Sequence, residues 1–64
     1  MLKNRLKERR TECGLSQVEL AAKAGISRAT ISKIENNEEV NLTTQTIAKL
    51  SEVLGVNPSE IFLF

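Results

Sequence analysis

The segment that most constrains this chain runs from Gln17 to Ile34, with the sequence QVELAAKAGISRATISKI. On either side of Gly25 its apolar residues recur three and four positions apart, the spacing that lines one face of a short helix. A glycine between the two runs adopts a positive φ without steric cost, which allows a tight turn. Ala21 is small enough for two helix axes to cross closely beside it. The segment therefore predicts two helices, over 17–24 and 28–35, packed against each other.

The same segment also has the apolar positions that would anchor both helices on one core. These are Leu20, Ala24, Ile26, Ile31 and Ile34. Two helices joined in this way form a helix-turn-helix, here over 17–35, which places its second helix in the major groove of DNA. Bundles with small residues at helix crossings also exist without DNA binding. Because the small residue, the turn glycine and the apolar anchors all stand where a helix-turn-helix needs them, we expect double-stranded DNA as the partner of this chain.

Composition excludes several other classes of function. The chain has 64 residues, which is enough for a single domain over 1–64. It has no histidine, the commonest general base, and Cys13 is its only cysteine, so no zinc site and no intrachain disulfide are expected. No serine has a plausible activating neighbour. We therefore predict no enzymatic activity, no metal and no cofactor, and we expect Cys13 to pack at the end of the first helix.

Hydropathy and charge indicate where the chain acts but not what it binds. The sequence has no apolar run of about 18 residues, the length that indicates a transmembrane helix, and its charged start contains no signal peptide, so we expect a cytoplasmic protein without membrane contact. The net charge of +1 does not by itself indicate a nucleic-acid partner. Charge is unevenly distributed, which suits one face against phosphate, although an ordinary solvated helix explains it as well. The residues concerned are Lys3, Arg5, Lys7, Arg9 and Arg10 near the start, and Glu38 and Glu39 after the motif.

Helix signals continue on both sides of the motif. The spacing of apolar residues predicts a first helix over 2–13, a fourth from Thr43 or Thr44 to Leu54, and a short fifth helix opened by Pro58. The expected architecture is therefore all-α, a compact bundle of five helices. The residues expected to cap or end these helices are Ser16 with Glu19, Ser27, Asn36, Asn37, Gly14 and Gly55.

The chain ends on four apolar residues, Ile61, Phe62, Leu63 and Phe64. Such a run is costly to leave in water. Three interpretations remain open: the residues close the core of the monomer, they form a dimer surface, or they pair as a short strand with Met1, Leu2 and Lys3 and support a dimer.

Three segments resemble the Cro/repressor class of helix-turn-helix proteins, the Xre-like regulators, and in particular lambdoid phage repressor DNA-binding domains. The segments are 14–27 (GLSQVELAAKAGIS), 31–36 (ISKIEN) and 47–56 (IAKLSEVLGV). The resemblance implies a five-helix bundle that binds DNA sequence-specifically through a recognition helix over 28–35. It also implies a transcriptional regulator, in the first place a repressor that acts as a homodimer on an inverted-repeat operator.

The resemblance further implies which residues would contact DNA. Arg28 is the best base reader, because a guanidinium bonds the O6 and N7 atoms of guanine together. Arg10 would form an ion pair with Glu35, between the first and third helices, and would be either purely structural or shared between Glu35 and a phosphate. The positions implied for base readout are Ser27, Arg28, Ala29, Ser32 and Lys33. Those implied for phosphate contact are Gln17, Thr30, Asn36, Asn37 and Arg10.

The chain departs from the family pattern in places, and two acids after the motif favour modest affinity for DNA. Glu38 and Glu39 stand where members often have Gly-Lys, and Arg9 stands where many have an aliphatic residue. The alternative function is that of an antitoxin or protein-interaction module of the same fold, whose apolar end, 61–64, binds a partner protein. Met1 is compatible with a natural start, and the apolar ending is compatible with a domain cut from a longer repressor.

Overall fold

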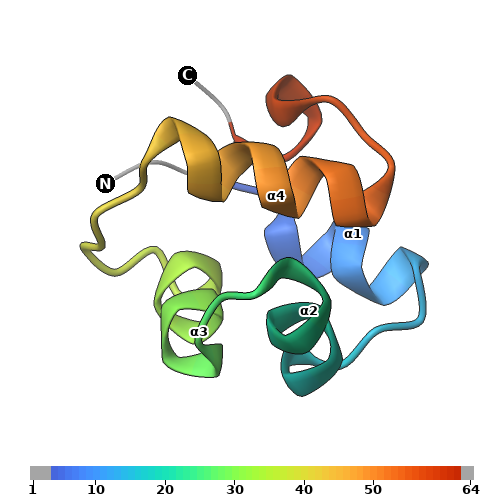
Figure 1. Ribbon diagram of the computed structural model, residues 1–64, viewed down its shortest axis with the longest axis horizontal. Helices are drawn as coiled ribbons and strands as arrows, with labels where there is room; N and C mark the ends of the chain where they lie inside the picture. The colour runs from blue at the N-terminus through green and yellow to red at the C-terminus, as the bar shows by residue number, and fades with distance from the viewer. Residues whose placement is uncertain (1–3, 63–64) are drawn as a thin grey trace.

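Helices account for most of the part of the chain that the computed structural model describes, residues 4–62. In chain order they are α1 (Leu6–Glu12), α2 (Gln17–Ala24), α3 (Arg28–Glu35), α4 (Thr44–Leu54) and a 3₁₀ helix, η1 (Pro58–Glu60). Figure 1 shows α2 and α3 side by side below α4, with α1 behind them. α2 packs against both α3 and α4, α1 packs against α3, and η1 packs against α4. The all-helical class with a helix-turn-helix is thus confirmed.

The boundaries of α2 follow from its own capping residues. The Ser16 hydroxyl accepts the backbone N–H of Glu19 at 3.0 Å, and the Glu19 carboxylate accepts the backbone N–H of Ser16 at 2.8 Å. This reciprocal capping box satisfies two amide donors that the first turn leaves without partners. At the other end Gly25 has φ +67°, a conformation that an L side chain would strain. The bounds predicted for α2 are confirmed.

Helix α3 also begins and ends where local signals predict. The Ser27 side chain accepts the backbone N–H of Thr30, which caps the first turn. At the end, Asn37 has φ +58°, and its N–H donates to Ile34 O at 3.1 Å. The N–H of Glu38 donates to Lys33 O at 2.9 Å, which completes a Schellman closure. Of the two asparagines predicted to end this helix, Asn37 adopts the left-handed conformation, whereas Asn36 keeps a negative φ.

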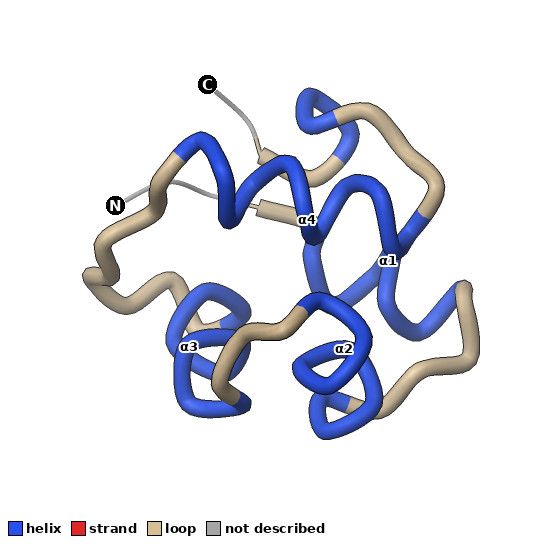
Figure 2. The backbone as a smooth tube through the Cα atoms, in the orientation of Figure 1, coloured by secondary structure: helices blue, strands red, loops and turns tan. Residues whose placement is uncertain are grey.

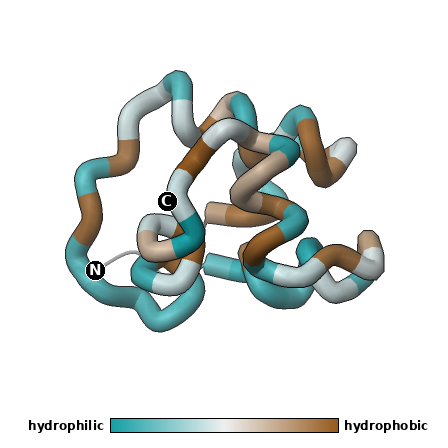
Figure 3. The backbone as a smooth tube through the Cα atoms, turned by 60° about the horizontal axis from the view of Figure 1, so that its bottom comes forward, coloured by the Kyte–Doolittle hydropathy of each residue, from teal (hydrophilic) through white to brown (hydrophobic). Residues whose placement is uncertain are grey.

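The core gathers one apolar face from each of the four α-helices. Figure 3 shows hydrophobic and polar residues alternating along the chain, so no helix is apolar on every side. Cys13, predicted to pack at the end of the first helix, is instead exposed, with its thiol donating to Leu54 O at 3.7 Å. The buried apolar residues are Leu6, Leu20, Ala21, Ala24, Ile31, Ile34, Leu50, Leu54, Ile61 and Phe62.

The start of the described chain differs from the predicted first helix. Asn4 forms an isolated antiparallel bridge with Phe62, and the N–H of Arg5 donates to Ile61 O at 2.6 Å. Figure 2 shows the two ends of the described chain lying side by side, where each meets its grey segment. Because these bonds hold Asn4 and Arg5 against the C-terminal segment, α1 begins only at Leu6. The prediction of helix from residue 2 is therefore wrong at Asn4 and Arg5. The predicted strand pairing of Met1, Leu2 and Lys3 lies outside the described residues.

The C-terminal segment also contains less helix than predicted. In place of a fifth α-helix the structure has the single 3₁₀ turn of η1, after which the chain turns inward. The side chains of Ile61 and Phe62 are 0% and 1% exposed, so they close the core of this one chain. The prediction that these two residues form a dimer or partner surface is corrected, since buried side chains present no such surface. Leu63 and Phe64 lie outside the described residues.

None of the helices within residues 4–62 is both long enough and apolar enough to cross a membrane.

Candidate nucleic-acid interface

One side of α3 is open to solvent along its whole length. Ile31 and Ile34 are buried in the core, which turns the opposite side of the helix outward. Arg28, Ala29 and Lys33 are exposed there, and Ser32 is half-buried. Among residues 4–62, neither Arg28 nor Lys33 forms an ion pair. Two unpaired cations therefore lie on the exposed side of the helix predicted to enter the major groove.

The first turn of α3 is held by hydroxyl groups. The hydroxyls of Ser27 and Thr30 lie 2.8 Å apart and are hydrogen-bonded, in addition to the backbone cap. Ser27 is exposed and Thr30 is half-buried. These bonds fix the N-terminal turn that carries Arg28. The positive end of the helix dipole also lies at this turn, which favours the approach of an anion.

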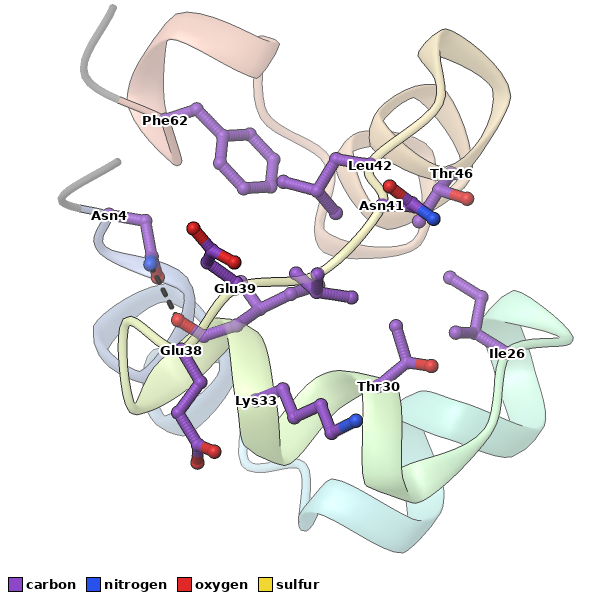
Figure 4. A pocket seen from close by; sticks show the side chains of 12 residues that line it. Asn4, Ile26, Thr30, Lys33, Glu38, Glu39, Asn41, Leu42, Thr46 and Phe62 are labelled. Atoms are coloured by element: carbon purple, nitrogen blue, oxygen red, sulfur yellow. Dashed lines mark hydrogen bonds between the residues drawn. The ribbon is translucent and has the colours of Figure 1, made fainter. Parts of the chain in front are cut away.

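A groove separates α3 from the loop that leads to α4, and its volume is about 960 Å³. Figure 4 shows Thr30 and Lys33 on the α3 side, facing Leu42 and Thr46 across the groove. The loop residues Glu38 and Glu39 also line it and are exposed. The cation Arg28 is thus at the N-terminal end of α3, and two acids follow its C-terminal end. The N-terminal end of α3 is therefore the more favourable end for DNA. The remaining lining residues are Asn4, Ile26, Ile34, Val40, Asn41 and Phe62.

Behind the exposed side of α3 lies a buried ion pair between Arg10 and Glu35. Nε of Arg10 donates to Oε2 of Glu35 at 2.7 Å, and Nη2 donates to Oε1 at 3.2 Å. Nη1 of Arg10 donates to Leu15 O at 2.7 Å. The two charged side chains are only 10% and 3% exposed. Hydrogen bonding to Glu35 raises the pKa of Arg10 above its ordinary value. The predicted ion pair between α1 and α3 is present.

The same contacts define the surroundings of Arg10, for which a phosphate contact was also predicted. Each of its three guanidinium nitrogens already donates to an acceptor inside the protein, and the side chain is buried. Arg10 therefore has a structural role, because it links α1 to the end of α3. The predicted phosphate contact of Arg10 is not tested by these bonds and stays a prediction.

Gln17 joins the buried pair from the first position of α2. Its Nε2 donates to Oε1 of Glu35 at 3.0 Å, and the residue is half-buried. This bond holds the side chain between the start of α2 and the end of α3. The second N–H of its amide has no partner among the described residues. The predicted phosphate contact of Gln17 stays a prediction, now with a defined orientation for its donor.

At the exit of α3 the structure brings in a residue that the sequence interpretation missed. Asn4 donates through Nδ2 to Ile34 O at 2.7 Å and to Oδ1 of Asn37 at 3.1 Å. The side chain of Asn36, by contrast, donates to the Ser32 hydroxyl at 3.5 Å, within one turn of the helix, and the residue is exposed. The sequence interpretation placed Asn4 inside the first helix and so gave no signal for this residue. Nothing in its sequence position indicates its contact with α3.

Comparison with known proteins places this arrangement among DNA-binding domains. A family model described as helix-turn-helix matches residues 6–61. The HTH-type transcriptional regulator SinR of Bacillus subtilis (strain 168) is 42% identical over 57 residues, which cover 89% of this chain and 51% of SinR. The chain thus spans about half the length of the curated relatives it matches.

Solved structures of two relatives superpose on nearly the whole chain. A crystal structure of SinR, the master regulator for biofilm formation, in complex with DNA has a TM-score of 0.80 and 42% identity, covering 86% of this chain and 87% of that one. The restriction-modification controller protein C.AhdI from Aeromonas hydrophila has a TM-score of 0.79 and 38% identity, covering 88% of this chain and 83% of that one.

Proposed function

This chain belongs to the helix-turn-helix family, among its Xre-like members, and from that premise we propose that it is a sequence-specific DNA-binding transcriptional regulator. The observation that carries the proposal is the open side of α3, where Arg28 and Lys33 are exposed and unpaired within residues 4–62. A similar relative, SinR, has a solved structure in complex with DNA, which supports the same partner for this domain.

In the proposed mechanism α3 lies in the major groove with its N-terminal turn against the base edges. Arg28 bonds guanine through two nitrogens, Ala29 contacts a thymine methyl group, and Lys33 bonds guanine or phosphate. The start of α2 faces the phosphate backbone, where free amide N–H groups favour an anion. The further residues proposed are Ser27 and Ser32 for base edges, and Gln17, Thr30, Asn36 and Asn37 for phosphates.

We propose further that the protein acts as a homodimeric repressor in the cytoplasm, with residues 1–64 as one DNA-binding domain. One recognition helix reads only a few base pairs, which gives limited discrimination. Two copies related by a two-fold axis read an inverted repeat whose half-sites lie about 34 Å apart, one helical turn. Occupation of a promoter by such a dimer would exclude polymerase.

The experiment that tests the function is selection from a pool of random DNA duplexes. The protein is incubated with the pool at about 150 mM salt, because weak phosphate binding dominates at lower salt, and the bound DNA is sequenced. The proposal predicts enrichment of an inverted repeat with half-sites one turn apart. A single enriched half-site would contradict the dimer, and a bound pool without any enriched sequence would contradict sequence-specific regulation by this domain alone.

A further inference from the structure

Asn4 joins three segments that are far apart in the chain. Its backbone pairs with Phe62 at the C-terminal end, and its side chain reaches the end of α3. Figure 4 shows the Asn4 side chain directed at the α3 end of the groove, with its hydrogen bond drawn as a dashed line. The residue is half-buried, so this contact is partly shielded from water. One short side chain therefore links the N-terminal segment to the exit of the recognition helix.

The orientation of the Asn4 carboxamide is set by two backbone groups of opposite kind. Its Oδ1 accepts the N–H of Leu6 at 3.0 Å, and a backbone N–H can only donate. Its Nδ2 donates to Ile34 O at 2.7 Å, and a backbone carbonyl can only accept. Exchanging the oxygen and nitrogen of the amide would break both bonds. Nδ2 must therefore face the end of α3.

This orientation in turn sets that of Asn37. The second N–H of Asn4 points at Asn37 and requires an acceptor, so Asn37 presents its Oδ1, at 3.1 Å. The Nδ2 of Asn37 is then the group turned away from Asn4, and it has no hydrogen-bond partner among residues 4–62. Asn37 is exposed and directly follows the C-terminal cap of the recognition helix. The free end of the Asn37 side chain is thus a hydrogen-bond donor, and a phosphate oxygen can accept from it.

We propose that Asn4 is a positioning residue for DNA binding: it orients the amide of Asn37 so that its N–H donors face the phosphate backbone. The inference rests on the proposed function and adds to it a residue outside the helix-turn-helix. Asn4 acts through Asn37 and makes no contact with DNA itself. Its effect on DNA binding therefore disappears when Asn37 lacks an amide.

A double-mutant cycle over Asn4→Ala and Asn37→Ala tests this dependence. Affinity is measured on a fixed duplex of random sequence, because a phosphate contact acts uniformly across sequences. Loss of one charge-assisted hydrogen bond predicts a weakening of about tenfold for Asn37→Ala, and up to that for Asn4→Ala. In the Asn37→Ala background, Asn4→Ala should change affinity less than about twofold, since coupled residues are not additive. The slope of log affinity against log salt should stay the same in all the alanine variants, because a neutral amide releases no counterion.

Two further variants separate positioning from loss of stability. Asn4→Asp keeps the acceptor for Leu6 and removes both donors, and its added charge acts in both Asn37 backgrounds and so cancels in the cycle. Ser51→Ala is the matched control, because it removes a buried side-chain hydrogen bond in α4, to Ile47 O, away from α3. All affinities are compared at a temperature where thermal unfolding shows every variant folded, and the Ser51→Ala variant should bind as the wild type does.

The inference is overturned if Asn4→Ala or Asn4→Asp weakens DNA binding equally in the protein with Asn37 and in the Asn37→Ala variant. It is also overturned if neither Asn4 variant weakens binding in either protein. It is also overturned if Ser51→Ala weakens binding as much as Asn4→Ala does. If the wild-type protein binds no duplex even at low salt, the proposed function is overturned, and the inference that rests on it is overturned as well.

Discussion

The two ends of α3 hold charges in opposite environments. At the C-terminal end the Glu35 carboxylate is 3% exposed and accepts three hydrogen bonds, two from Arg10 and one from Gln17. At the N-terminal end Arg28 is exposed and has no ion pair within the described chain. The charge of Glu35 holds helices together, whereas the charge of Arg28 is free to bind a partner molecule. Residue type alone does not separate these uses, because Arg10 and Arg28 carry the same group.

Burial gives the two arginines opposite consequences on substitution. When one partner of a buried ion pair is removed, the other charge stays buried without compensation, so the free energy of unfolding falls. An exposed charge is solvated in the free protein, so its removal acts on binding and leaves folding almost unchanged. Changes at the two ends of α3 should therefore separate stability from DNA affinity.

The largest expected effect comes from breaking the buried pair. Glu35→Ala leaves the guanidinium of Arg10 without its charged partner inside the protein, and we expect a loss of about 3–5 kcal/mol in the free energy of unfolding. Urea unfolding followed by circular dichroism measures it. Glu12→Ala is the matched control, since the pair of Glu12 with Arg9 lies at the surface, where Glu12 is 61% exposed, and should cost far less. Equal losses for the two variants would show that burial does not set the strength of these pairs.

A smaller effect, on DNA rather than on folding, is expected at the other end of the helix. Arg28→Ala should weaken binding to the selected operator by about 1–3 kcal/mol and relax the preference at one base pair. Titration of the operator and of single-base variants, by fluorescence anisotropy, measures both changes. Lys33→Ala serves as the comparison variant on the same exposed side. If Arg28→Ala leaves affinity and base preference intact, or lowers stability as Glu35→Ala does, Arg28 is not the base reader.

The smallest effect concerns an exposed carboxylate with backbone partners, in contrast to buried Glu35. The backbone N–H of Ser16 donates to Glu19 and lowers the pKa of Glu19 below its ordinary value. A carboxyl whose pKa is lower in the folded chain stabilises the fold above its unfolded pKa, about 4.3, and this contribution is lost as the pH falls through the folded pKa. Urea unfolding between about pH 6 and pH 3 should therefore show a shallower acid loss for Glu19→Gln than for the wild type. An unchanged acid profile would contradict the cap.

The helix-turn-helix was predictable from sequence because its signals are local. Ser16 with Glu19, Gly25 and Ser27 each act within one turn of a helix, and the structure has α2 and α3 at the predicted bounds. The exposed side of α3 follows from the same periodicity, since burying Ile31 and Ile34 leaves Arg28 and Lys33 outside. The ion pair of Arg10 with Glu35 came from the family resemblance, and no spacing rule connects those two positions.

The interpretation was wrong where contacts join distant parts of the chain. A helix was expected through Asn4 and Arg5, but both residues are held by backbone bonds to Phe62 or Ile61. The apolar ending left three interpretations open, and burial in the core decided among them for Ile61 and Phe62. No local pattern distinguishes an apolar run that fills its own core from one that covers a partner.

By itself, then, the sequence determined the two short helices of the motif, their caps, the glycine turn and the side of α3 that faces outward. These features depend on backbone conformations and on periodicities that a few neighbouring residues decide. Only the tertiary structure decided that Arg10 also donates to Leu15 O, that Asn4 orients Asn37, and that Ile61 and Phe62 close the core. The physical reason is that hydrogen-bond partners and burial belong to positions in space, and in this chain those positions are occupied by residues from opposite ends of the sequence.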